Sequence, residues 1–308
     1  MRKALVEALV SLARNDPRIV LLTGDLGYSV IEPFQEEFPD RFYNVGVAEQ
    51  NMVGISTGLA ESGLIPYVYS IVTFATLRPY EFIRNGPILH QLPVRIIGVG
   101  GGFDYGTAGP THHGLEDVGI FRHYPGMDIF TPADGEQLQT IMQKNWENPG
   151  PAYYRVGKFD DLKVPGLGGR YEPGQLDTVI QGTDVLILTM GGIAVEAVSA
   201  ADQLRELGIS AQVSLVSQMN PMPGEAILES LADFTQVCTV EAHFITGGLG
   251  SGVAEIIAES GHYCRLKRFG IGTMGAGKTG GYRYLLSRSG LDADSLCSEI
   301  AAWVRTVS

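Results

Sequence analysis

The chain has 308 residues, of which 44% are hydrophobic and 18% charged, as in ordinary globular proteins. Its net charge of −12 argues against a nucleic-acid partner, because phosphate backbones bind clustered cations. Cys238, Cys264 and Cys297 lack metal-ligand spacing and suggest free thiols in a reducing compartment. With no signal-like N-terminus and no apolar run of membrane-spanning length, we expect a cytoplasmic protein that does not bind membranes.

The first half of the chain alternates apolar strands with helices. An amphipathic helix opens it within residues 1–18 and ends at Asn15-Asp16-Pro17. Strands are predicted over residues 19–23, 42–47, 65–69, 94–99 and 152–155, and further helices over 32–38, 49–61 and 77–90. Because the strands are apolar throughout and alternate with helices, we expect a parallel sheet covered on both faces.

The second half repeats this pattern after residues 161–180, which are rich in proline, glycine and charge and are predicted to be a linker. Strands are predicted over residues 185–190, 211–216, 235–241 and 264–269, and helices over 192–207, 224–231, 252–259 and 294–304. The predicted fold class is therefore α/β, with domains at residues 1–160 and 181–308. Each domain is expected to be a mostly parallel sheet covered by helices on both faces.

Glu49 follows a predicted strand and opens a helix of small and apolar residues. Open α/β sheets bind ligands at this carboxyl edge. A glutamate in a first helical turn often does no more than complement the helix dipole. A carboxylate held in an apolar crevice is instead suited to proton transfer. The segment by itself leaves both interpretations open.

The segment Phe42–Ala60, with its Gly-Val-Ala-Glu turn, resembles the pyrimidine domain of transketolases and the related 1-deoxyxylulose-5-phosphate synthases. In that family the glutamate hydrogen-bonds the aminopyrimidine of thiamine diphosphate and activates this cofactor, so the resemblance implies this role for Glu49. Phe74 matches the aromatic residue placed against the aminopyrimidine. Ile71 replaces an aromatic residue of the same wall, and Asp25 is also expected at the cofactor.

The loop Gly106–Asp117 resembles the family's Gly-x-Asp-Gly-Pro-Thr-His-Gln loop. His112 matches its active-site histidine, which contacts the sugar donor, so we expect a catalytic role in stabilising developing charge. Ala108 replaces an aspartate that senses the configuration of a sugar hydroxyl. The stereochemical preference is therefore open.

Arg2, Ser29 and Arg155 match positions that bind the sugar phosphate in transketolases. Guanidinium groups suit this task because they are always charged and bind phosphate oxygens in pairs. Gly100 replaces a histidine of the same set. Arg2, Ser29 and Arg155 thus imply a phosphorylated substrate, whereas Gly100 does not.

A possible nucleotide site occurs near the C-terminus, where Gly272–Thr279 fits the P-loop pattern. Gly280 and Gly281 are a poor helix start, since each glycine costs about 1 kcal/mol. The stretch Gly290–Ala293 and the final helix resemble the transketolase C-terminal domain instead. A P-loop nucleotide-binding module is the alternative from a different class.

The resemblance covers only the last two domains of a three-domain family. The Gly-Asp-Gly motif, which holds the metal ion of the diphosphate-binding domain, is missing from the sequence. We therefore expect no metal ligands in this chain and a partner chain carrying that domain with Mg²⁺ or Ca²⁺, in an α2β2 assembly. The expected activity is ketol transfer from a phosphorylated ketose to an aldose. The open alternatives are a 2-oxoacid dehydrogenase β subunit and a subunit that passes a two-carbon unit to a carrier protein.

Overall fold

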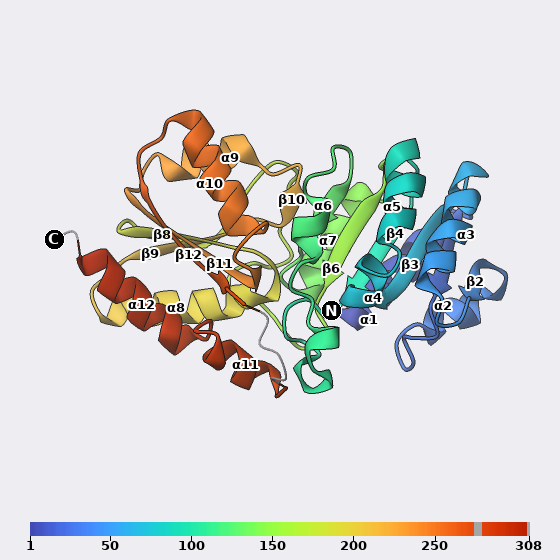
Figure 1. Cartoon of the computed structure of the whole chain (residues 1–308), viewed down its shortest axis with the longest axis horizontal. Coiled ribbons are helices and arrows are strands. Elements are labelled where there is room, and N and C mark those ends of the chain that lie inside the picture. The colour runs from blue at the N-terminus through green and yellow to red at the C-terminus, as the bar shows by residue number, and fades with distance from the viewer. Residues whose placement is uncertain (274–278, 307–308) are drawn as a thin grey trace.

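The computed structural model of this chain describes residues 1–273 and 279–306. Two α/β units lie side by side, one built mainly from the first half of the chain and the other from the second (Figure 1). In each unit most neighbouring strands are parallel and helices cover both faces of the sheet. The predicted fold class is confirmed.

The first sheet has the strand order β10-β5-β6-β4-β3-β1-β2 within the described residues. Its strands are β1 (Ile19–Thr23), β2 (Phe42–Asn44), β3 (Ile65–Ile71), β4 (Arg95–Val99), β5 (Asp128–Phe130), β6 (Ala152–Val156) and β10 (Gln218–Asn220). Its helices are α1 (Arg2–Asn15), α2 (Glu32–Glu37), α3 (Glu49–Glu61), α4 (Val72–Thr76), α5 (Tyr80–Ile83), α6 (Asp117–Phe121) and α7 (Gly135–Asn145).

Strand alternation explains why this sheet is covered on both sides. Successive side chains of a strand point to opposite faces. Ile19 and Leu21 of β1 pack in the core formed with α1 and α7, whereas Val20 and Leu22 pack in the core that contains α3 residues. A strand buried on both faces is apolar at most positions, which is the pattern that residues 19–22 show.

The second sheet has the order β12-β11-β8-β9-β7 within the described residues. Its strands are β7 (Asp177–Ile180), β8 (Val185–Thr189), β9 (Ala211–Leu215), β11 (Gln236–Phe244) and β12 (Arg265–Ile271). Its helices are α8 (Ala194–Glu206), α9 (Gly224–Leu231), α10 (Leu249–Ser260), α11 (Tyr282–Arg288) and α12 (Ala293–Arg305).

Two strands differ from the predicted domain division. β7, inside the predicted linker, is an antiparallel edge strand of the second sheet. β10, from the second half of the chain, pairs antiparallel with β5 at the edge of the first sheet. Edge strands satisfy their backbone groups on one side only, so short polar segments can fill these positions without a strong sequence signal.

The helix predicted over residues 77–90 is confirmed in part, because the chain is helical over residues 80–90 and residues 77–79 form a turn. α4 ends before this range, and α5 continues without a break into a π-helical turn, Arg84–Ile88. Pro79 separates α4 from α5, and Pro87 lies within the π-helical turn. Proline lacks the backbone donor that an uninterrupted α-helix needs.

In residues 1–273 and 279–306, no helix combines the length and apolarity needed to cross a membrane. Residues 274–278 of the P-loop pattern lie outside the described residues.

Candidate active site

Glu49 begins α3 at the carboxyl edge of the first sheet, as the sequence predicted. The turn from β2 is held by Asn44, whose side-chain oxygen accepts hydrogen bonds from the backbone of Gly46 and Asp25. Gly46 has a φ of +73°, a conformation that favours glycine. The Glu49 side chain is nearly buried, with 2% exposed, yet it borders an open cleft of about 740 Å³.

Three side chains contact Glu49 or one another beside this cleft. Nη1 of Arg78 lies 2.9 Å from both carboxylate oxygens of Glu49. The same guanidinium lies 3.9 Å from the centroid of the Phe74 ring. Ser70, at the end of β3, donates a long hydrogen bond of 3.4 Å to the carboxylate. Glu49 and Phe74, which the sequence paired, are therefore joined through Arg78.

His112 also packs against Phe74. The rings of Phe74 and His112 have centroids 5.0 Å apart in an edge-to-face arrangement. Nδ1 of His112 lies 2.9 Å from the hydroxyl of Thr111, and the carbonyl of Thr111 accepts a hydrogen bond from Thr73 in α4. This bond ties the histidine loop to the segment that carries Phe74, so Glu49, Phe74 and His112 lie in one contact chain.

The two remaining residues expected at the cofactor lie at this edge but do not contact the carboxylate. Asp25 follows β1, is exposed and accepts hydrogen bonds from Asn44 and Tyr28, which lower the pKa of its carboxyl group. Ile71 is the last residue of β3 and is half-buried. Both positions stay proposals.

The residues expected at the phosphate are not brought together as a set. Ser29 is exposed and uses its backbone N–H to bind Glu32. Arg155 is buried, and its guanidinium donates to Asp117 and to the carbonyls of Gly114 and Ala242. Because protein acceptors engage its Nε and Nη2, the geometry favours a structural role for Arg155, and a phosphate contact by this residue stays a prediction.

Arg2 is closer to the histidine loop than its terminal position suggests. Its Nε donates to the carbonyl of Lys158 and its guanidinium pairs with Asp160 at 3.7 Å. Nζ of Lys158 lies 4.3 Å from the centroid of the Tyr105 ring, whose centroid is 6.4 Å from that of His112. Lys158 therefore places a cation over Tyr105, next to the histidine loop, and Arg2 binds the backbone of Lys158.

Sequence reasoning missed Arg78 and Lys158. Arg78 lies in the turn after α4, four residues beyond Phe74, so its closeness in the sequence to Phe74 is the signal that could have found it. Lys158 lies three residues after Arg155, in the same exit from β6. The sequence showed two cations there but not which one the sheet would bury.

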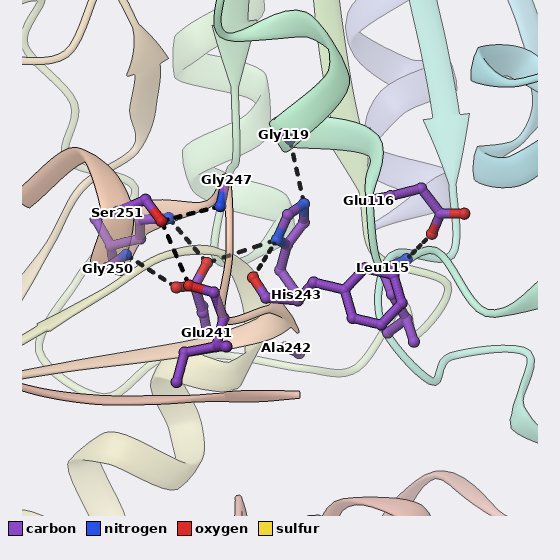
Figure 2. Close-up of polar contacts among 12 residues, drawn as sticks. Leu115, Glu116, Gly119, Glu241, Ala242, His243, Gly247, Gly250 and Ser251 are labelled. Atoms are coloured by element: carbon purple, nitrogen blue, oxygen red, sulfur yellow. Dashed lines mark hydrogen bonds and ion pairs between the residues drawn. The ribbon is translucent and has the colours of Figure 1, made fainter. Parts of the chain in front are cut away.

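A second polar cluster joins the two units away from Glu49 (Figure 2). Glu241 in β11 accepts hydrogen bonds from the backbone N–H groups of Leu249 and Gly250, at 2.8 and 2.9 Å, and so caps α10. Burial raises the pKa of Glu241 to about 7. Beside it, Nε2 of His243 accepts a hydrogen bond from the backbone of Gly119 in the first unit, and burial lowers the pKa of His243.

The described residues contain no group of three or more histidine, cysteine or acidic side chains able to hold a metal ion. The nearly buried carboxylate of Glu49 at an open cleft, with the Phe74 ring joined to it through Arg78, fits the aminopyrimidine part of thiamine diphosphate.

Comparisons with known proteins agree with this arrangement. A family model described as transketolase, pyrimidine binding domain, matches residues 1–159, and the transketolase C-terminal domain matches residues 174–296. A putative transketolase C-terminal section of Methanocaldococcus jannaschii is 36% identical over 97% of this chain and 95% of its own length. An apulose-4-phosphate transketolase subunit of Actinobacillus succinogenes is 33% identical over 95% of this chain and 94% of its own.

A longer relative and a solved structure support the same grouping. The 1-deoxy-D-xylulose-5-phosphate synthase of Syntrophus aciditrophicus is 34% identical over 85% of this chain, which corresponds to 41% of that enzyme. A structure described as a split gene transketolase, inactive beta4 tetramer, superimposes with a TM-score of 0.88 at 33% identity, covering 99% of this chain and 97% of that one. With these matches and the geometry around Glu49, the chain belongs to the transketolase family.

Proposed function

We propose that the chain is the pyrimidine-binding subunit of a split thiamine diphosphate-dependent transketolase, which transfers a two-carbon ketol unit from a ketose to an aldose. The observation that carries this proposal is the nearly buried carboxylate of Glu49 at an open cleft, beside Phe74. The names of the relatives, a transketolase subunit among them, support it.

Each residue has a distinct task in this proposal. When bound, thiamine diphosphate supplies a nucleophilic carbon that carries the two-carbon unit. Glu49 forms a hydrogen bond with the aminopyrimidine or transfers a proton to it. The burial of its carboxyl group keeps water from competing for this hydrogen bond. The face of Phe74 packs against that ring. His112, at the edge of Phe74, donates hydrogen bonds toward substrate oxygens as charge develops.

The diphosphate and its Mg²⁺ or Ca²⁺ are assigned in this proposal to a partner chain, in an α2β2 assembly. Two comparisons support a partner: a relative of nearly the same length is named as one subunit of a transketolase, and the structural neighbour is described as an inactive beta4 tetramer.

We infer that the substrate carries an anionic end near Arg2 and Lys158. Lys158 lies over Tyr105 next to the loop of His112, Arg2 binds the backbone of Lys158, and neither cation is fully buried. A phosphate is the class of group that such a pair binds, through charge-assisted hydrogen bonds. The relative named for apulose-4-phosphate acts on a phosphorylated sugar by its name, which agrees with this class.

The test is Glu49→Gln in the chain reconstituted with its diphosphate-binding partner, thiamine diphosphate and Mg²⁺. We expect the variant to fold and assemble as wild type and to lose at least about 100-fold in kcat, within the usual range for a lost proton-transfer group. Glu61→Gln, at the exposed end of the same helix, is the matched control and should keep full activity. Near-normal turnover by Glu49→Gln would refute the proposed role.

A further inference from the structure

Arg78 occupies the two groups that the proposed function assigns to the cofactor. Its Nη1 lies 2.9 Å from both oxygens of Glu49, and the carbon at the centre of its guanidinium lies 3.9 Å from the Phe74 ring centroid. A flat, cationic group thus lies over the ring while it donates to the carboxylate. An aminopyrimidine bound to Glu49 and packed on Phe74 would need the same space.

We propose that Arg78 is a built-in placeholder, which holds Glu49 and covers Phe74 in the cofactor-free chain and must swing away before the aminopyrimidine can bind. The inference rests on the proposed function, because it takes Glu49 and Phe74 as the aminopyrimidine site. It adds an intramolecular competitor to that site.

The environment of Glu49 explains why such a group is needed. A carboxylate with 2% exposure loses most of its hydration, and a buried charge without a partner is costly. Besides Arg78, the described residues offer it only the long hydrogen bond from Ser70. A cation that fills the place until the cofactor arrives keeps the carboxylate paired in both states.

The environment of Arg78 explains why it can leave. Its side chain is 44% exposed, and within the described residues it donates hydrogen bonds to Glu49 alone. The adjoining cleft is open, and its neighbours Val47 and Leu77 are exposed. The released guanidinium can therefore turn toward water, where its charge is well solvated.

Competition of this kind lowers the apparent affinity for the cofactor. The apparent dissociation constant equals the intrinsic one divided by the fraction of chains whose site is uncovered. For a partly exposed ion pair, removal of Arg78 should tighten binding by about three- to tenfold.

The experiment titrates thiamine diphosphate, at fixed Mg²⁺, into the chain assembled with its diphosphate-binding partner, and measures heat of binding rather than activity. Arg78→Met should bind about three- to tenfold more tightly than wild type. Arg84→Met, an exposed arginine bound to Asn85 in the next helical turn, is the matched control and should not change affinity. Arg78→Lys keeps the charge but has no planar group to stack, so it should fall between the two.

A second arm uses the full chain alone, without cofactor. Urea unfolding is measured for Glu49→Gln, Arg78→Met and the double variant. The loss in free energy of unfolding of the double variant should differ from the sum of the two single losses, because each single change removes the same ion pair. In the assembled protein, the gain in affinity from Arg78→Met should vanish when Glu49 is already glutamine.

The outcomes distinguish failure of the placeholder from failure of the proposed function. Wild type that binds thiamine diphosphate no more weakly than Arg78→Met overturns the placeholder and leaves the proposed function standing. Failure of every variant to bind, with an assembled partner present, overturns the proposed function and the placeholder with it. Tighter binding by Arg78→Met together with the loss of that gain beside Glu49→Gln supports the placeholder.

Discussion

Arg155 and Lys158 lie only three residues apart, yet their side chains have different surroundings. Both are cations at the end of β6, and by charge either could meet a phosphate. The β6 register places Arg155 opposite Gly98 of β4, and its guanidinium is taken up by Asp117 and two carbonyls. Lys158 lies beyond the strand, beside Tyr105. Side-chain direction, which depends on strand pairing, separates them.

At the residue scale we predict that Lys158→Met raises KM for a phosphorylated donor roughly tenfold or more, because a charge-assisted hydrogen bond contributes about 1.5–3 kcal/mol. KM for an unphosphorylated sugar should change little, and so should the unfolding midpoint. Lys163→Met is the control, since Lys163 is exposed and pairs with Glu136. Equal effects on both substrates would contradict a phosphate contact.

At the scale of elements, α10 depends on a carboxylate from a neighbouring strand. Glu241 accepts hydrogen bonds from the first N–H groups of α10, which lack partners within the helix. A Cβ at Gly248 would lie 1.9 Å from Oε2 of Glu241, so only glycine allows this approach. The glycine-rich turn was visible in the sequence, but the carboxylate that it accommodates was not.

This cap makes stability depend on pH. The pKa of Glu241 rises from an ordinary 4.5 to about 7, chiefly by burial. The folded state therefore binds the proton more tightly than the unfolded state, and the resulting stability is lost as pH rises from about 4.5 through 7. We predict that, between pH 5 and 8, the free energy of unfolding of wild type falls by roughly 2–3 kcal/mol relative to Glu241→Gln.

Urea unfolding at several pH values measures this difference, since other titrating groups, His243 included, contribute to both proteins. Glu259→Gln, at the exposed end of α10, should follow wild type at every pH. A parallel pH dependence of wild type and Glu241→Gln would show that Glu241 does not couple folding to protonation.

At the scale of the whole molecule, the two units share one interior. A hydrophobic cluster runs from Val118 and Phe121 of α6 to Met190 and Leu249 in the second half of the chain. Arg155 adds a polar link, since it binds Asp117 in its own unit and the carbonyl of Ala242 in the other. β10 crosses in the opposite direction to complete the first sheet. Residues of each predicted domain therefore contact or complete the other domain.

We predict that Asp117→Asn lowers the free energy of unfolding by about 3–5 kcal/mol, because it leaves Arg155 buried without its counter-charge. Nε of Arg155 lies 2.8 Å from Oδ2 of Asp117, and the side chains of Asp117 and Arg155 are 1% and 6% exposed. The hydroxyl of Tyr153 donates a hydrogen bond to the same carboxylate oxygen. Asp161→Asn, on the exposed connection between the units, should be neutral. A loss below about 1 kcal/mol for Asp117→Asn would contradict this account.

Local sequence determined the α/β class and most elements, because apolar strands and helical periodicity are written within windows of a few residues. β1, α3 and α9 have the bounds expected of them. The same local signals placed Glu49 at the carboxyl edge of the sheet. They failed where the local signal was weak, as for the short polar strand β10.

Tertiary structure alone decided which charged groups meet. Arg78 pairs with Glu49, which is 29 residues away, and Arg155 with Asp117, which is 38 away. No local pattern encodes such pairs, because they depend on how strands align and which side chains the packed units bury. The family motifs indicated Glu49, Phe74 and His112, and folding brought these residues together. Folding also showed that a cation of the same chain covers the first two.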